Sequence, residues 1–142
     1  MVDNTASTVW RGDLQSGSGH TRLETSSVAE FDVNWKARSE GDTSVTTPEE
    51  LLAAAHSSCF SMAFSLGLAQ NGTPPEQLDV SAKVTFVPGE GVTRSVLTVT
   101  GTVPGLEPER FRELAEDAKA NCPVSKALAG IEIVLDSAVL DQ

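Results

Sequence analysis

The sequence has little of several chemically special residue types: its 142 residues include two cysteines, two histidines, no tyrosine and only 5% aromatic residues. Basic residues are also scarce, at ten against twenty acidic ones, and a formal charge of −10 opposes binding to phosphate backbones and anionic membranes. We therefore expect neither nucleic acid nor a membrane as a partner. No uninterrupted apolar run approaches the roughly 20 residues of a membrane span, and the first residues contain no apolar leader. These absences predict a soluble, cytoplasmic protein.

The scarcity of cysteine also limits what the two sulfurs can do. A chain of this length buries a sizeable core without disulfide bonds, so cysteines in a reducing compartment are expected to be reactive, metal-binding or simply buried. No internal repeat and no low-complexity linker interrupts the sequence. We expect one folded domain that spans residues 1–142.

The pattern of residues predicts an α+β fold with helices on a mostly antiparallel sheet. Short β-leaning segments broken by glycine and serine predict three strands, at 7–10, 19–25 and 29–36. The segment 47–50 (TPEE) then offers an N-cap, a proline at the first helical position and two acidic residues, which predicts a long helix that ends at Asn71-Gly72. The apolar stripe of this helix is expected on Leu52, Ala55, Cys59, Ala63 and Leu66.

The second half of the chain predicts a hairpin, two helices and a last strand. Alternating apolar residues at 78–86 and a Val/Thr-rich segment at 92–103 flank a turn at Pro88-Gly89-Glu90-Gly91. Pro108 begins a second helix. The remaining expectations are a buried face of Phe111, Leu114, Ala115 and Ala118, a helical turn from Cys122 to Leu128, and a strand at 131–135.

Cys59 and Cys122 are the residues that could carry chemistry. Cys59 alone is most simply a small buried residue in the middle of a helix. Cys122 directly precedes Pro123, at the cap of a helical turn whose unpaired N–H groups would favour a thiolate. His56 lies one helical turn before Cys59, so a metal site of His56, Cys59 and Cys122 is an alternative, although zinc usually shows a fourth ligand at a recognisable spacing. His20 is expected in a Gly/Ser-rich loop without a partner.

Glu49 and Arg38 are harder to place. If the helix is continuous, Glu49 lies about 15 Å along its axis from Cys59, so it reaches Cys59 only if the first turn unwinds or if it serves a second subunit. A carboxylate that complements the helix dipole is the simpler reading. Arg38 is expected as a surface charge at the end of a strand.

Two segments resemble the signatures of the OsmC/Ohr family of organic hydroperoxide reductases. Residues 48–63 (PEELLAAAHSSCFSMA) resemble the family's first signature, and residues 121–128 (NCPVSKAL) resemble its resolving-cysteine motif. Residues 10–13 (WRGD) and 103–106 (VPGL) are also similar to family segments, and all four occur in the family's order. His56 before the first cysteine, and valine after Cys-Pro, resemble the OsmC branch.

The resemblance implies an OsmC-like fold in which antiparallel sheets wrap two central helices of an intertwined homodimer, with active sites at the interface. It implies that Cys59 is the peroxidatic cysteine, that Cys122 is the resolving cysteine, and that Glu49 forms a charged pair with an arginine. Arg38 is our choice for that arginine, and Arg11 and Arg22 remain alternatives.

The reaction that the resemblance implies is the reduction of organic hydroperoxides to alcohols, in oxidative stress defence and without a cofactor. A Cys59 sulfenic acid would become a Cys59–Cys122 disulfide, and a dithiol reductant of lipoyl type would close the cycle. The apolar residues Leu52, Phe60 and Met62 around Cys59 would favour alkyl hydroperoxides. The alternatives are a non-catalytic dimeric carrier of small apolar ligands and a metal-binding protein.

Overall fold

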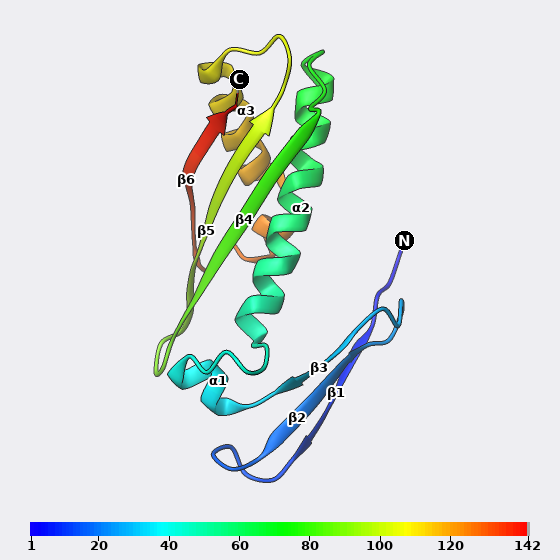
Figure 1. The fold of residues 1–142 in the computed structure, drawn as a ribbon, viewed down its shortest axis with the longest axis vertical. Helices are drawn as coiled ribbons and strands as arrows, with labels where there is room; N and C mark the ends of the chain where they lie inside the picture. The colour runs from blue at the N-terminus through cyan, green and yellow to red at the C-terminus, as the bar shows by residue number, and fades with distance from the viewer. Residues whose placement is uncertain (142) are drawn as a thin grey trace. The chain divides into compact units, whose positions relative to one another are not determined.

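The structure, a computed structural model, describes residues 1–141 and forms two compact units, Met1–Leu51 and the part that begins at Leu52. Each unit is described by itself. The first unit contains β1 (Ala6–Arg11), β2 (Ser18–Leu23), β3 (Glu30–Val33) and α1 (Trp35–Glu40), and α2 (Pro48–Gln70) begins in it (Figure 1).

The three strands of the first unit form an antiparallel sheet in the order β1-β2-β3. The three expected strands are therefore confirmed, but the third ends at Val33, and the prediction that it continues to Lys36 is wrong. Residues 35–40 are helical because both ends carry local capping groups. The Asn34 Oδ1 atom accepts the N–H of Ala37 at 2.8 Å, and Gly41 ends the helix with a φ of 76°.

The long helix α2 begins where the sequence predicts. Thr47 Oγ1 accepts the backbone N–H of Glu50 at 3.0 Å, which confirms the expected N-cap. The predicted stripe is confirmed only in part, because Cys59 and Ala63 pack against the core whereas Ala55 and Leu66 are exposed. The fully buried residues of the second-unit part of α2 are His56, Phe60, Phe64 and Leu68, spaced four residues apart. The side chains of α2 itself are small or apolar on every side of the helix, so periodicity could not select the buried face.

The second unit builds one three-stranded sheet, with helices on one face. The predicted hairpin is confirmed, because β4 and β5 pair antiparallel. The last strand, β6, is parallel to β5, since the chain crosses over through α3 and α4 before it returns. The elements are β4 (Gln77–Val87), β5 (Gly91–Thr102), α3 (Pro108–Asn121), α4 (Pro123–Ala127) and β6 (Glu132–Leu140).

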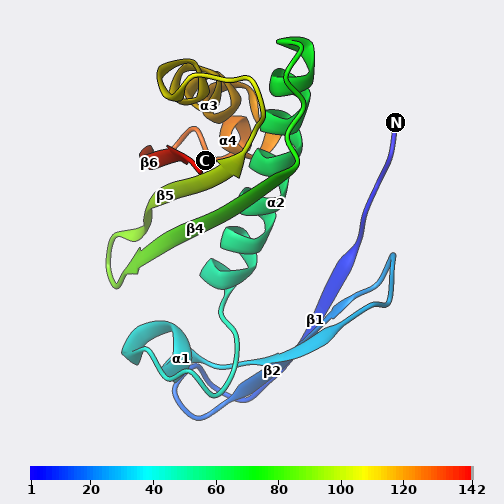
Figure 2. The ribbon, with the colours of Figure 1, turned by 45° about the horizontal axis from the view of Figure 1, so that its top comes forward.

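The core of the second unit lies between this sheet and the helices α2 and α3 (Figure 2). The Phe64 ring packs against Phe60 and Phe111, with ring centroids 5.6 and 4.9 Å away. Gly101 of β5 lets the Phe111 ring approach closely, because a Cβ atom there would lie 2.7 Å from the ring. The predicted buried face of α3 is confirmed, since Phe111, Leu114, Ala115 and Ala118 are all buried.

The surface of α2 is unusually apolar for a helix of which so little is buried. Among residues 1–141, α2 is the one helix long and apolar enough to cross a membrane by these two measures, although the core helix of a soluble protein passes the same test. Its Phe60, Phe64 and Leu68 side chains already belong to a protein core. Its other sides expose Met62 at 71% and Leu66 at 59%. An apolar surface of this kind typically marks a binding or association site.

Candidate active site

The fold brings Cys59 and Cys122 together, although they lie far apart in the sequence. Cys59 comes from the middle of α2, and Cys122 from the junction between α3 and α4. Both are free thiols, and their side chains are hydrogen-bonded to each other. Cys122 is fully buried, whereas Cys59 is only partly buried. Cys59 is therefore the partly exposed cysteine of the pair, and Cys122 lies in the core.

The surroundings of Cys59 set the ease with which its thiol ionises. Burial, followed by the hydrogen bond with Cys122, raises the pKa of the Cys59 thiol above its usual value. The backbone N–H of Val124 opposes this effect and lowers the pKa, because it donates to the Cys59 sulfur. Within the second unit the effects that raise the pKa prevail, so Cys59 is mainly protonated at neutral pH.

The N-terminal turn of α4 serves a different cysteine from the one expected. Cys122 does occupy the N-cap position, but its side chain makes no capping hydrogen bond. The Val124 N–H in this turn instead contacts the sulfur of Cys59. A capping hydrogen bond from the Cys122 side chain is therefore not formed, and the N–H of this turn is donated to Cys59. Sequence spacing cannot show which sulfur the folded turn faces.

His56 is fully buried beside this pair and has a complete set of partners. Its Nδ1 lies 2.7 Å from Ser95 Oγ on β5, and its Nε2 lies 2.8 Å from Ser125 Oγ on α4. Burial lowers the pKa of His56, so the ring is neutral at neutral pH. Both ring nitrogens are occupied by hydroxyls, and residues 1–141 hold no cluster of three or more His, Cys, Asp or Glu suited to a metal ion. The structure gives no support to the metal-binding alternative.

In the first unit, Arg38 and Glu49 form an ion pair. Arg38 Nε donates to Glu49 Oε1 at 2.7 Å; the arginine side chain is 33% exposed and the glutamate side chain 7%. Arg38 lies in α1, so the expectation of a surface charge at the end of a strand is wrong. Of the three arginines considered, Arg22 is engaged by Glu24 and Glu30, and Arg38 is the one that contacts Glu49.

The other oxygen of Glu49 stands out within the described residues. Its Oε2 atom is buried and has no hydrogen-bond partner among residues 1–141. Buried carboxylate oxygens nearly always have donors, so this oxygen calls for one, such as an ordered water or a group of another molecule.

An apolar groove of about 780 Å³ begins at Cys59 and runs between α2 and α3. Its volume is within the usual range for small-molecule sites. Polar groups of the lining, including Arg110 and Asn71, lie near the C-terminal end of α2, where Arg110 donates to Asn71 Oδ1 at 3.3 Å. Its apolar lining includes Met62, Ala63, Leu66, Leu114 and Ala118.

The three residues expected around the substrate lie in different environments. Met62 lines the groove and is largely exposed. Phe60 is fully buried against Phe64, and Leu52 is half-buried; neither of them lines the groove. Within the second unit, Met62 is therefore the one of the three that an incoming ligand in the groove would contact.

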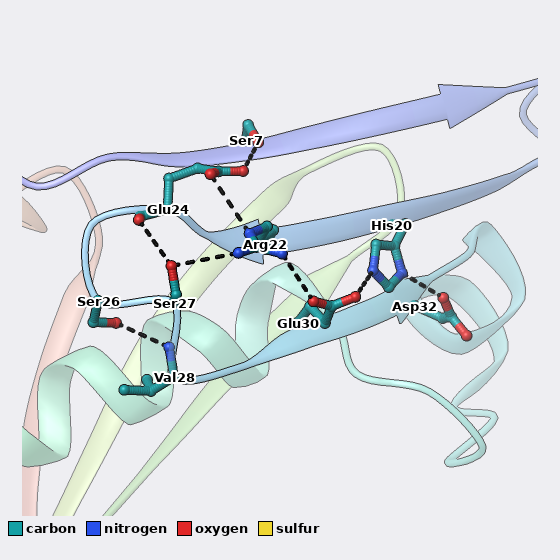
Figure 3. A network of polar contacts seen from close by, with 9 residues as sticks. All are labelled: Ser7, His20, Arg22, Glu24, Ser26, Ser27, Val28, Glu30 and Asp32. Carbon is teal, nitrogen blue, oxygen red and sulfur yellow. Dashed lines mark hydrogen bonds and ion pairs between the residues drawn. The ribbon is translucent and has the colours of Figure 1, made fainter.

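A second polar cluster lies on β2 and β3 (Figure 3). His20 Nδ1 is 2.8 Å from Asp32 and its Nε2 is 2.7 Å from Glu30, which also pairs with Arg22. The hydrogen bond with Asp32, and then that with Glu30, raises the pKa of His20. The prediction that His20 occupies a loop without a partner is therefore wrong. Exposed pairs of this kind contribute little to stability. Neither cysteine belongs to the cluster.

Two small sheets, a long apolar helix and two adjacent free thiols beside a groove define an α+β protein of the two-cysteine type. Comparison with known proteins narrows this class. Residues 40–136 match the family model described as OsmC-like protein, and the chain belongs to this family. The prediction of the OsmC/Ohr family and of an OsmC-like α+β fold for the single chain is confirmed.

Two relatives illustrate the similarity in sequence. The chain is 38% identical over 130 residues to the protein named peroxiredoxin OsmC of Escherichia coli (strain K12), with 89% of this chain and 90% of that protein covered. It is 36% identical over 101 residues to the organic hydroperoxide resistance protein-like 1 of Staphylococcus saprophyticus, with 68% and 71% covered.

Solved structures show the same fold. An organic hydroperoxide resistance protein from Elizabethkingia anophelis matches with a TM-score of 0.69 and 26% identity, over 96% of both chains. The organic hydroperoxide resistance protein OhrB of Bacillus subtilis matches with a TM-score of 0.63 and 27% identity, over 96% of this chain and 98% of that one.

Proposed function

We propose that this protein is a cysteine-based peroxidase that reduces organic hydroperoxides to alcohols. The names of its relatives, peroxiredoxin and organic hydroperoxide resistance protein, support a peroxide-related redox role. The observation that carries the finer proposal is the contact between two free thiols, one of them accessible at the end of an apolar groove. When a peroxide oxidises one of two such sulfurs, the other can react with it to form a disulfide.

The proposed reaction has two steps in the protein and one that restores it. The Cys59 thiolate attacks the distal oxygen of the hydroperoxide, the O–O bond breaks, and the alkoxide takes up a proton and leaves as the alcohol. The Cys122 thiol then attacks the Cys59 sulfenic acid, which forms the disulfide and releases water. A dithiol reductant, which we propose to be of lipoyl type, takes the sulfurs back to thiols and becomes a disulfide itself.

The proposed role of Arg38 and Glu49 is to stabilise the thiolate of Cys59. The pKa of Cys59 is raised by burial and by Cys122, so a cation is needed to stabilise the anion. We propose that Arg38 supplies it, because a guanidinium cannot lose its proton and Glu49 fixes its orientation. A lone carboxylate would oppose the thiolate, so Glu49 acts through the arginine.

We propose that the working protein is a soluble, cytoplasmic homodimer in which residues 1–142 act as one domain. The exposed apolar side of α2 and the orphan Glu49 Oε2 both support a second copy. Small side chains, such as Ala54, Ala55 and Ser58, allow close helix contact on that side.

The groove is the proposed substrate site, and Met62 is the residue through which it recognises an alkyl group. Each methylene buried there contributes about 0.8 kcal/mol, so cumene hydroperoxide should react with a higher kcat/KM than hydrogen peroxide. Leu52 and Phe60 would support this apolar environment from behind. Equal efficiency for both peroxides would contradict the apolar preference.

Non-reducing mass measurement after peroxide treatment tests the proposal. The wild-type protein should lose two hydrogens in a Cys59–Cys122 link, and Cys122→Ser should gain one oxygen at Cys59 instead. Cys59→Ser should neither form the link nor consume peroxide. Unchanged thiols after treatment of the wild-type protein would favour the non-catalytic carrier. Turnover with dihydrolipoamide but not with a monothiol would support the proposed class of reductant.

A further inference from the structure

His56 is a fully buried titratable residue that takes no part in the reaction steps above. Its two ring nitrogens contact hydroxyls from two different elements, Ser95 on β5 and Ser125 on α4. Ser95 is fully buried and Ser125 is 5% exposed. A neutral imidazole has one donor and one acceptor nitrogen, and a hydroxyl can serve either, so all three groups are satisfied at once. The ring thereby ties α4 to the central strand of the sheet.

We propose that His56 is a positioning residue: through Ser125 it holds the turn that carries Cys122 in place for the thiol chemistry proposed above. The inference rests on the proposed function, because the role assigned to His56 is in that thiol chemistry. The contacts of His56 do not depend on it. The inference concerns the second unit alone, in which every contact involved lies.

The short helix α4 is attached to α2 by two polar contacts that are neighbours in both elements. On α4 they come from consecutive residues, the N–H of Val124 and the hydroxyl of Ser125. On α2 they reach Cys59 and His56, which are three residues apart and therefore share one face of the helix. The two contacts together fix both the distance and the rotation of the turn relative to Cys59.

Disulfide formation requires this precision. Cys59–SOH and Cys122–SH must bring their sulfurs to about 2.05 Å at a restricted dihedral angle, with water as the other product. A displacement of about 1 Å can slow such a positioned reaction by roughly 100-fold. A sulfenic acid that is not resolved is open to a second peroxide, which oxidises it to the sulfinic acid.

Ser125→Ala cuts the contact on α4, and Ser95→Ala is the matched control, because it removes an equally buried hydroxyl from the other nitrogen of the same ring. Each protein is equilibrated with glutathione and glutathione disulfide, and the Cys59–Cys122 disulfide is quantified. This equilibrium needs no peroxide. Ser125→Ala should lower the equilibrium constant about tenfold or more, Ser95→Ala less than threefold, and Ser125→Thr should restore the wild-type value.

Sulfenic acid trapping supplies the kinetic measurement. At equal peroxide, Ser125→Ala should give more dimedone adduct and more sulfinic acid at Cys59 than Ser95→Ala. Equal values for Ser125→Ala and wild type in both assays would overturn the inference, and so would equal losses in the two alanine variants. If Ser125→Ala does not fold, His56→Gln replaces it. Values for His56→Gln equal to those of the wild type would likewise overturn the inference. If no variant reacts with peroxide but the glutathione equilibrium constants follow the expected order, the proposed function is refuted and the positioning role stands.

Discussion

Replacement of His56 by leucine should destabilise the protein by an amount that the buried contacts define. The substitution leaves the hydroxyls of Ser95 and Ser125 buried without their partner, since both lie within 2.8 Å of the imidazole and are almost fully buried. Each unpaired hydroxyl costs about 1–3 kcal/mol. The burial of the leucine offsets part of this, so we expect a net loss of about 2–4 kcal/mol in the free energy of unfolding.

The triple variant His56→Leu/Ser95→Ala/Ser125→Ala separates the effect of the polar contacts from that of the ring volume. Removal of both hydroxyls together with the ring leaves an apolar cluster with no unsatisfied group, which can be nearly neutral. The triple variant should therefore regain most of the stability that the single variant loses. This recovery distinguishes a satisfied polar unit from a histidine that contributes only through its volume.

Urea unfolding followed by circular dichroism at 222 nm is the appropriate assay, at one fixed protein concentration because an associating protein is stabilised by mass action. Helices report on the second unit well, since α3 and nearly all of α2 lie within it. Tryptophan fluorescence does not, because Trp10 and Trp35 are both in the first unit.

The pH dependence of the free energy of unfolding gives a second measure of the contribution of His56. Burial lowers the pKa of His56 below its unfolded value of 6.5, so the unfolded chain binds the proton more readily. Stability should fall as pH drops below about 6.5 towards the folded pKa, and the leucine variant should lack this loss. A single variant as stable as the wild type, or a triple variant no more stable than the single one, would refute the account of the buried unit.

Further outcomes follow from other features. Gly101→Ala should cost about 1–3 kcal/mol in thermal unfolding, because the new methyl group meets the Phe111 ring, whereas Gly67→Ala, with open space at its Cβ, should not destabilise. Met62→Glu should elute as a monomer in gel filtration if the exposed side of α2 is the dimer interface; an unchanged dimer would contradict this. His20→Gln should destabilise below pH 6.5 and not at high pH, because contacts with Asp32 and Glu30 raise the pKa of His20 and their contribution is lost as pH rises through it. Arg38→Gln should slow the first oxidation of Cys59 by peroxide in stopped-flow experiments without preventing disulfide formation by diamide; an unchanged rate would eliminate Arg38 as the cation.

Elements with signals in a few consecutive residues were predictable from the sequence. The start of α2 depends on Thr47 and Pro48, and the buried face of α3 follows from its spacing of apolar residues. The missed helix α1 also had local signals, since Asn34 and Gly41 cap its two ends. The residues between them form too short a segment for an apolar period to emerge, so periodicity does not indicate this helix.

Other features could not be read from local pattern. The buried face of α2 is decided by which neighbours arrive, and an evenly apolar helix does not specify them. The partners of His56 lie 39 and 69 positions away, on elements that only the folded chain brings together. The family resemblance supplied the pairing of Cys59 with Cys122, but it could not indicate that the α4 turn donates its N–H to the first of these sulfurs.

The thiol of Cys59 and the proposed cation, Arg38, belong to different units of the chain. Cys59 is mainly protonated in its own unit, because burial and Cys122 raise its pKa and a single backbone N–H opposes them. A protonated thiol reacts slowly with any peroxide. Arg38 is held by Glu49 in the other unit, so in the proposed mechanism the nucleophile forms only where the assembled protein presents this pair to the sulfur. In this proposed mechanism, ionisation of Cys59 is coupled to assembly, and the raised pKa of the buried Cys59 thiol slows its oxidation in the unassembled chain.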